Sequence, residues 1–199
     1  MTTVPLRDRQ STVARTAIFE ALVRHLEAGD ADDVSMEELA REAGVSRRTL
    51  YRYFPSRSEL LAAVSDWIRD DVLQLPIGIG DEGIAESFRV AAARVQRRPE
   101  LARALLKTET GRAVRTGYRG DRAKAIRGAL QREVPNLPPS DVRQAAAVLG
   151  YLCSSNAWIT IQDESGVSAA RAQAAVVWAI NTLLAQLRAG DNADLHRNG

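Results

Sequence analysis

Cysteine and histidine are scarce in this chain. Its 199 residues include one cysteine, Cys153, and two histidines, His25 and His196. A single thiol cannot form an intramolecular disulfide, and it leaves no cysteine cluster for a metal ion. The two histidines lie too far apart in the sequence to suggest a catalytic pair, and no carboxylate pair sits in a diagnostic motif. The sequence therefore predicts no metal site, no cofactor and no catalytic residues, and we expect a protein that is not an enzyme.

Long apolar runs and strand patterns are missing too. No stretch reaches the roughly eighteen apolar residues that a membrane-spanning helix needs. The start of the chain carries Arg7, Asp8 and Arg9 with no apolar segment behind them, unlike a secretory signal peptide. Alternating β-branched residues are absent, whereas alanine and leucine dominate. We expect an all-α, cytoplasmic protein without a membrane partner.

The chain also lacks an overall excess of positive charge. Its 27 basic residues, of which only two are lysine, are nearly balanced by 25 acidic ones, for a net charge of +2. Total charge therefore does not argue for nucleic acid. The local pattern does, because the segment between Glu42 and Glu59 is basic and contains no acid. Its arginines are Arg47, Arg48, Arg52 and Arg57.

Residues 35–54 have the pattern of two short helices joined by a tight turn. Ser35 with Glu38 forms a capping box, which predicts that a helix begins at Met36. Gly44 can adopt a positive φ angle, which ends that helix and turns the chain. Ser46 then caps a second helix that ends near Phe54. Helix, short glycine turn and second helix predict a helix-turn-helix whose second helix reads DNA.

The second helix carries an unusual set of side chains for its length. Leu50 and Phe54 are four residues apart and predict a thin buried stripe. The other faces offer guanidinium, hydroxyl and phenol groups, which suit base edges and phosphates. We predict base-edge contacts from Arg47, Arg48 and Thr49. The other predicted DNA-binding residues, chiefly phosphate contacts, are Ser35, Tyr51, Tyr53 and Arg57, the last at the start of the next helix, where free N–H groups favour an anion.

These motifs resemble the N-terminal DNA-binding domain of the TetR family of transcriptional repressors. The resemblance covers roughly residues 15–64, and it departs from the family at Arg57, where lysine is usual. It rests on Ala43-Gly44-Val45-Ser46, on Thr49 through Arg57 and on Glu59-Leu60-Leu61. It implies a second domain that holds a small-molecule effector, whose binding shifts the fourth helix. The coupling would run through Trp67.

The rest of the chain predicts a larger helical domain. We place the helix-turn-helix domain at residues 1–57 and an effector-binding and dimerisation domain at residues 58–199, with about nine helices in all. A helix from Arg57 to Leu75 links the two, before a linker rich in proline and glycine. Further helices are predicted over about 85–96, 99–114, 121–133, 141–163 and 168–187.

The last two predicted helices have small and aliphatic faces with more apolar surface than one hairpin can hide. They predict either a four-helix interface with a twofold mate or packing within their own domain. A dimer also suits the reading helix, because one helix reads only a few base pairs. The predicted interface residues are Ala146, Leu149, Cys153, Val176, Ala179, Ile180 and Leu183.

An effector pocket is implied by the family resemblance rather than by periodicity, since apolar residues at helical spacing are usually plain core. An apolar cavity with a few polar groups would suit a small apolar ligand. The candidate lining residues are Trp67, Phe88, Leu105, Thr108, Tyr118, Tyr151, Asn156 and Trp158. Two shorter stretches, 97–101 and 154–158, resemble TetR regulators that include actinobacterial sterol-catabolism repressors, which implies a bulky apolar or acyl-CoA-type effector.

Taken together, these patterns predict a homodimeric repressor that binds a palindromic operator in double-stranded DNA and is released by a small apolar effector. The alternative is an architectural DNA-binding protein without an effector. That alternative lacks an obvious excess of positive charge and leaves the large second domain unexplained.

Overall fold

The computed structural model describes residues 6–76 and 78–190, so His196 lies outside the described residues. This part of the chain is helical throughout and contains no strand, which confirms the all-α prediction. It has eleven α-helices and one π-helical turn, somewhat more than the nine expected. None of the described helices is both long and apolar enough to cross a membrane. The elements are α1 (Leu6–Ala28), α2 (Met36–Glu42), α3 (Arg47–Tyr53), α4 (Arg57–Trp67), η1 (Ile68–Val72), α5 (Gly83–Val95), α6 (Pro99–Lys107), α7 (Glu109–Thr116), α8 (Arg119–Glu133), α9 (Pro139–Leu152), α10 (Ser155–Ser165) and α11 (Ala169–Ala189).

The helices form two compact units. Unit 1 comprises the chain up to Val72 together with Glu100–Gly117, and unit 2 comprises Leu73–Pro99 and the chain from Tyr118 onward. Helices α6 and α7 thus belong to the same unit as the predicted helix-turn-helix, although they follow α5 in the sequence. The boundary at residue 57 remains a prediction about function, since the helix that begins there continues within unit 1.

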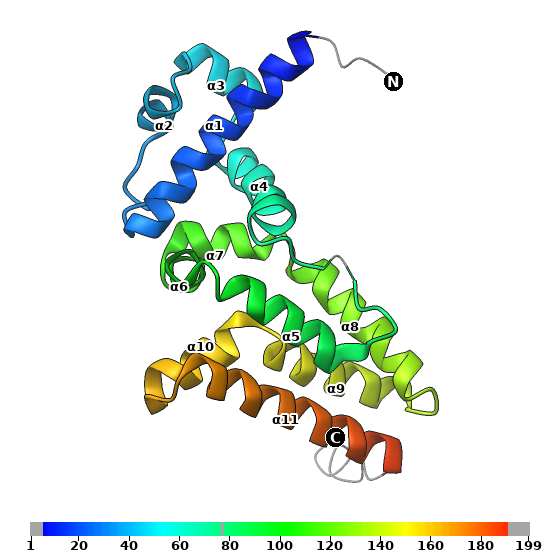
Figure 1. Ribbon diagram of the computed structural model, residues 1–199. Helices are drawn as coiled ribbons and strands as arrows, with labels where there is room; N and C mark the ends of the chain where they lie inside the picture. Colours follow the sequence, from blue (N-terminus) through cyan, green and yellow to red (C-terminus); the bar gives the residue numbers. More distant parts are fainter. Residues whose placement is uncertain (1–5, 77, 191–199) are drawn as a thin grey trace. The chain divides into compact units, whose positions relative to one another are not determined.

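The first three helices of unit 1 pack around a small apolar core. Figure 1 shows α1 in blue beside α2 and α3, and α2 contacts both of the others. The predicted inward stripe of α3 is confirmed, because Leu50 and Phe54 are buried. Phe19 of α1 contacts Phe54 at a centroid distance of 5.5 Å and Trp67 at 5.6 Å. These aromatic contacts hold α3 against α1 and orient its other faces outward.

The helix that begins at Arg57 ends earlier as an α-helix than expected. Regular α4 stops at Trp67, and a π-helical turn from Ile68 to Val72 replaces the predicted continuation to Leu75. Val64 and Ile68 are fully buried, so the apolar face passes through the change in helix type. The sequence carries no local marker of a π turn at this position.

The predicted helix over 99–114 is divided into α6 and α7 at Thr108. The Thr108 side chain accepts a hydrogen bond from the Gly111 N–H and so caps α7. Gly111 lies where the two helices meet, and a Cβ there would be 2.3 Å from the Ala104 carbonyl oxygen. A threonine cap and a glycine at the close approach together make the sharp turn possible.

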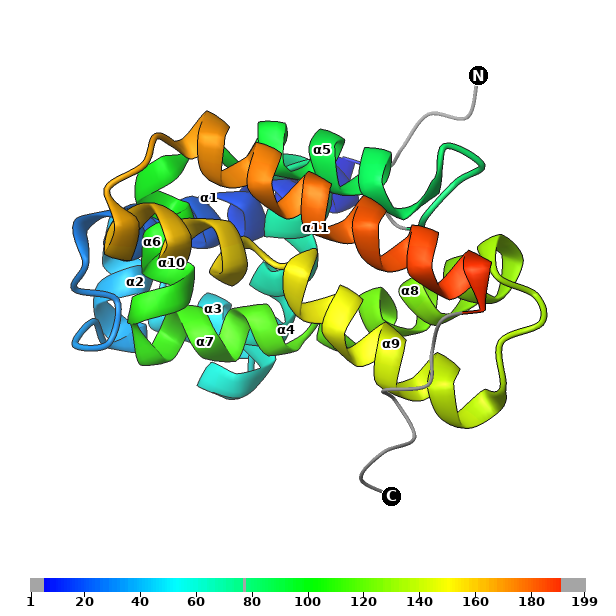
Figure 2. The same cartoon turned by 90° about the horizontal axis from the view of Figure 1, so that it is seen from below.

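Unit 2 is a bundle of five helices. Helix α11 runs along α5, α9 and α10, as both Figure 1 and Figure 2 show, and α8 packs on α5 and α9. The predicted helix over 141–163 is also divided, into α9 and α10, because Cys153 and Ser154 leave the helix. The Ser154 hydroxyl donates to the Tyr151 carbonyl oxygen at 2.6 Å, which stabilises this turn. Ser168 caps α11 and Gly190 ends it with a φ of 76°, close to the limits that the sequence predicts.

Candidate nucleic-acid interface

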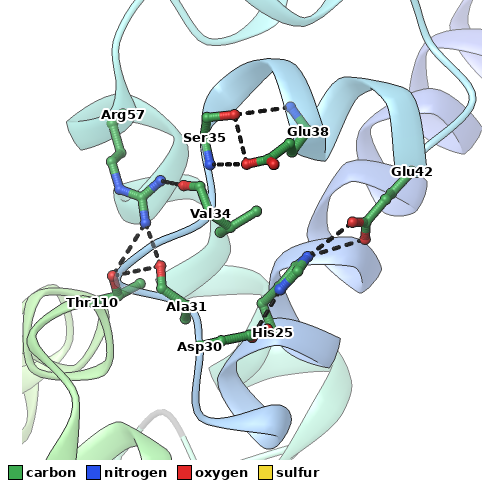
Figure 3. A network of polar contacts seen from close by, with 9 residues as sticks. All are labelled: His25, Asp30, Ala31, Val34, Ser35, Glu38, Glu42, Arg57 and Thr110. Carbon is green, nitrogen blue, oxygen red and sulfur yellow. Dashed lines mark hydrogen bonds and ion pairs between the residues drawn. The ribbon is translucent and has the colours of Figure 1, made fainter.

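The helix-turn-helix is built by local hydrogen bonds that the sequence predicts. The Ser35 side chain accepts from the Glu38 N–H at 3.2 Å, and the Ser35 N–H donates to the Glu38 carboxylate at 2.9 Å. The capping box is thus confirmed (Figure 3). Gly44 has a φ of 67° in the turn, and the Ser46 side chain caps α3 by accepting from the Thr49 N–H. These caps set where α3 starts, and so which of its side chains face outward.

The outer face of α3 is basic and aromatic. Arg47, Arg48 and Arg52 are exposed, whereas Thr49 and Tyr51 are half-buried at its edges. The side chain of Arg47 is 71% exposed, so a ligand can reach its guanidinium. The structure therefore brings the predicted base-contacting residues together on one accessible helix. Direct contact with DNA stays a prediction for each of them.

A carboxylate that is not among the predicted DNA-binding residues lies beside Arg47 and Tyr51. Oε1 of Glu37, in the first turn of α2, lies 3.0 Å from Arg47 Nε in an ion pair and accepts a hydrogen bond from the Tyr51 hydroxyl at 3.3 Å. The Arg47 guanidinium also lies over the Tyr51 ring, 5.5 Å from its centroid. Because Tyr51 follows Glu37 by fourteen residues, no local sequence signal pairs them.

The side chains of Ser11 and Arg52 position the Tyr53 phenol. Hydrogen bonds from the Ser11 hydroxyl and from the Arg52 guanidinium lower the pKa of the Tyr53 phenol. The Arg52 Nη2 group donates to the Tyr53 hydroxyl oxygen at 3.2 Å, and its guanidinium lies 5.0 Å from the ring centroid. Tyr53 is thus positioned by α1 and by its own neighbour, which suits a side chain that presents a hydroxyl to a phosphate.

Arg57 has partners within the protein. Its Nη1 group donates to the Val34 carbonyl oxygen at 2.8 Å and its Nη2 group to the Ala31 carbonyl oxygen at 2.6 Å. Nη2 also donates to the Thr110 hydroxyl at 3.2 Å (Figure 3). The guanidinium is part-buried and tied to the loop between α1 and α2. Its role as a phosphate ligand stays a prediction, but the structure gives it a second role that the sequence did not reveal.

The same loop is fixed to α7 by a carboxylate. Asp32 accepts from the Thr110 N–H at 2.6 Å and from the Glu109 N–H at 2.9 Å. These backbone hydrogen bonds at the N-terminus of α7 lower the pKa of Asp32. Arg57 and Asp32 therefore clamp the α1–α2 loop to α4 and α7, and we call Ala31, Asp32, Val34, Arg57 and Thr110 the loop clamp.

His25 connects α1 to the end of α2. Its Nδ1 atom lies 2.8 Å from the Asp30 carboxylate, and its Nε2 atom lies 3.1 Å from the Glu42 carboxylate (Figure 3). Burial lowers the pKa of His25, but these hydrogen bonds and the two negative charges outweigh it, so the net shift is upward. The charged form of the ring thus stabilises the packing of α2 on α1.

The predicted effector-pocket residues are divided between the units. Unit 1 contains Trp67, Leu105 and Thr108; unit 2 contains the other five. Within unit 1, Trp67 packs on Phe19 and Thr108 caps α7, so both also have structural roles. In unit 2 the buried members are Phe88, Tyr118 and Trp158, whereas Asn156 is half-buried and Tyr151 is 54% exposed.

A cavity of about 460 Å³ lies elsewhere in unit 2, between the α8–α9 loop and the end of α11. Its lining includes Val134, Leu137 and Leu187, and none of the predicted effector residues. Over residues 6–76 and 78–190, no three histidine, cysteine, aspartate or glutamate side chains gather as a metal site would require. Burial raises the pKa of the Cys153 thiol to about 12, so it is uncharged at neutral pH.

The predicted dimer-interface residues differ in how far they are buried within their own chain. Ala146, Leu149, Val176 and Ile180 are buried within their own chain, which leaves them almost no area for a partner. Cys153, Ala179 and Leu183 are half-buried. The exposed large apolar side chains of α9 and α11 are instead Val148, Tyr151 and Trp178, at 51%, 54% and 70% exposure. Periodicity thus did not predict which apolar side chains of α9 and α11 are exposed, and the dimer interface itself stays a prediction.

Fold and site define a helical protein with a helix-turn-helix DNA-binding domain. Residues 18–64 match the family model described as "Bacterial regulatory proteins, tetR family". The crystal structure of a TetR transcriptional regulator from Rhodococcus sp. RHA1 has a similar fold, with a TM-score of 0.53 at 20% identity over 88% of this chain and 97% of that one. Residues 18–64 therefore carry a DNA-binding domain of the TetR type, as the sequence motifs indicate, and the described chain has a fold similar to that of a TetR regulator.

Curated relatives match mainly over the DNA-binding region. An uncharacterised helix-turn-helix-type transcriptional regulator of Mycobacterium tuberculosis is 41% identical over 58 residues, which are 29% of each chain. The nucleoid occlusion factor SlmA of Vibrio cholerae is 30% identical over 98 residues, which are 46% of this chain and 50% of that protein. The match thus spans half or less of these relatives.

Proposed function

We propose that the protein is a transcriptional repressor that binds a palindromic DNA operator as a homodimer in the cytoplasm, without catalytic activity. The observation that supports this most is the outer face of α3, which presents Arg47, Arg48 and Thr49 on an accessible, capped helix beside a glycine turn. A helix of this kind enters the major groove, where guanidinium and hydroxyl groups distinguish base pairs.

The remaining contacts are proposed to go to phosphates. Tyr51 and Tyr53 present phenol hydroxyls from the edges of α3, and the Ser35 hydroxyl lies at the start of α2. The Ser35 hydroxyl already donates to Glu38 at 2.8 Å, so a phosphate contact would have to replace or share that bond. Such contacts fix orientation and contribute salt-dependent affinity without reading sequence.

Dimerisation is proposed to use the outer faces of α9 and α11. Val148 and Tyr151 of α9 and Trp178 of α11 are large apolar side chains left exposed on helices that contact each other. Small neighbours, such as the exposed Ala147 and Ala175, would let a second copy approach closely. Aromatic side chains are also the residue types that dominate the energetics of interfaces.

The dimer is tested by light scattering at micromolar concentration on Trp178→Glu, with Val90→Glu as the matched control. Val90 is an exposed apolar side chain of α5 in the same unit, at 37% exposure. We expect the wild type and the Val90 variant to be dimers and the Trp178 variant to be a monomer. A monomeric wild type would remove the dimer from the proposal.

Release by a small apolar effector is the final part of the proposal. It rests on the family and on the buried aromatic residues Phe88, Tyr118 and Trp158 of unit 2. A bulky apolar or acyl-CoA-type compound is the class to screen first. The screen measures whether a compound releases bound DNA from the protein. A second sample of the protein is denatured and refolded before the assay. If it binds DNA more tightly than the untreated sample, an effector was retained during purification.

The alternative function is an effector-independent DNA-binding protein. It is favoured by the similarity over 98 residues to a protein named as a nucleoid occlusion factor. Such a role would show DNA binding that no member of a broad ligand panel changes. An architectural binder would, in addition, show no sequence preference, with affinity that falls smoothly as salt rises.

A further inference from the structure

An acidic side chain on the predicted DNA-binding surface calls for an explanation. Glu37 is 45% exposed and lies beside the outer face of α3, where phosphates would approach. A carboxylate there repels DNA, and a surface ion pair with arginine adds only about 0–1 kcal/mol to stability. The position of Glu37 in the first turn of α2 adds a similar amount, about 0.3–1 kcal/mol, through the helix dipole, so stability gives only a modest reason for a glutamate at this place.

The geometry of the contacts suggests a different reason. One carboxylate oxygen, Oε1, forms an ion pair with Arg47, 3.0 Å from its Nε atom, and accepts a hydrogen bond from the Tyr51 hydroxyl at 3.3 Å. The guanidinium also lies over the Tyr51 ring. Glu37 and Tyr51 thus restrain the Arg47 side chain, although this side chain is long, flexible and exposed on the surface.

The ion pair with Glu37 is formed by the Nε atom of Arg47. Because Nε is engaged, the two terminal Nη groups of Arg47 remain available at the end of the side chain. End-on contact through two N–H groups is how arginine recognises the O6 and N7 acceptors of guanine. An arginine without this support could rotate toward the nearest phosphate, where it would contribute affinity but no sequence information.

We propose that Glu37 is a specificity-determining positioning residue, which orients Arg47 for guanine and keeps it away from the phosphate backbone. This inference rests on the proposed function, since it requires that α3 reads bases. Glu37 acts on the base preference through Arg47. Its negative charge also disfavours binding modes in which the backbone approaches α2 closely.

The test compares the wild type with Glu37→Ala and Glu37→Gln in parallel selections from random duplex DNA at fixed salt. Arg47→Ala identifies the base pair that Arg47 reads, as the position whose preference it relaxes. At that position we expect Glu37→Ala to reduce the preference for guanine roughly tenfold. We expect Glu37→Gln, which keeps an oxygen acceptor but loses the charge, to have a smaller effect in the same direction.

A second measurement separates positioning from a structural role. If Arg47 is free to contact phosphate in Glu37→Ala, binding to random DNA becomes tighter and the slope of log affinity against log salt steepens by about one unit. Loss of structure would weaken binding instead. Glu20→Ala is the matched control, because Glu20 is an exposed glutamate of α1 in the same unit. It changes the net charge equally and should leave the guanine preference unchanged.

The double variant lacking both Glu37 and Arg47 completes the design. Because Glu37 acts through Arg47, removing it from the Arg47→Ala background should change the base preference no further. An additional loss in that background, or an unchanged guanine preference in Glu37→Ala, would overturn the inference while the proposed function stands. A wild type that selects no sequence would refute the proposed function itself.

Discussion

Replacing Arg57 by alanine distinguishes a DNA ligand from a structural residue. A phosphate ligand could be removed with little effect on folding. In the structure, however, the Arg57 guanidinium donates at 2.8 and 2.6 Å to the carbonyl oxygens of Val34 and Ala31. Ala31 is fully buried, so its carbonyl group has little access to replacement water. The alanine variant leaves these acceptors without their charged donor.

The expected cost follows from these two bonds. A hydrogen bond that involves a charged group contributes about 1.5–3 kcal/mol. Since Arg57 is part-buried rather than enclosed, water recovers some of this, and we expect a loss of about 2–4 kcal/mol in the free energy of unfolding. For a chain of this size that corresponds to a melting temperature lower by roughly 5–15 °C. Lysine at this position should restore little, because one ammonium group cannot reproduce the planar fork.

The assay is urea unfolding followed by circular dichroism, with salt-dependent DNA binding measured on the same preparations. Arg48→Ala is the control, because Arg48 is an exposed arginine of α3 and is predicted to contact base edges. We expect the Arg48 variant to keep its stability and lose DNA affinity. An Arg57→Ala protein with wild-type stability and a shallower salt slope would refute the structural role and support the phosphate contact.

Three further predictions concern separate parts of the chain. Leu50→Asp should abolish folding, because Leu50 is fully buried, whereas Tyr51→Ala should keep the circular dichroism spectrum and lose DNA affinity; a parallel loss of both signals in both variants would contradict this division. The pKa of His25 is raised in the folded state, so its stabilisation is complete below the unfolded value of about 6.5 and is lost as pH rises through the folded value. Unfolding across pH 5.5–8.5 should show this decline in the wild type but not in His25→Gln. Cys153 should react with a thiol-alkylating reagent much more slowly than free cysteine at pH 7.5, because burial raises the thiol pKa to about 12; equal rates would contradict the packing around it.

Local signals in the sequence predicted the geometry of the helix-turn-helix well. The capping box at Ser35, the glycine turn at Gly44 and the cap at Ser46 act over three or four residues, so their geometry follows directly from the residue types. The inward stripe of Leu50 and Phe54 follows from helical spacing in the same way. Each of these features can be predicted from residues that lie within a few positions of one another in the chain.

Contacts between distant residues could not be predicted in this manner. The partners of Arg57 lie 23 to 53 residues away, and Asp32 meets Thr110 across 78 residues. From the sequence, a basic residue at a helix start predicts a phosphate ligand, whereas the carbonyl groups that accept its hydrogen bonds come from distant residues that no local pattern indicates. The same limit applies to Glu37, whose importance depends on the packing of α2 against α3.

The faces of the last helices illustrate a different limit. Helix α11 is apolar on more than one side, and burial places Val176 and Ile180 inward but Trp178 outward. Helical periodicity gives the angle between these residues around the helix axis, but it does not show which of them point toward the core. The breaks at Thr108 and Cys153 do not follow from periodicity either; the first has a local signal, since Thr108 is followed three residues later by Gly111, whose N–H it caps.

The most direct test of the proposed function is selection of random duplex DNA by the purified protein at one fixed, near-physiological salt concentration. A specific dimeric regulator should enrich a palindrome, with half-sites about 34–36 Å apart or a multiple of that distance. Binding without any enriched sequence, lost smoothly as salt rises and unchanged after the protein is denatured and refolded, would contradict sequence-specific recognition by α3.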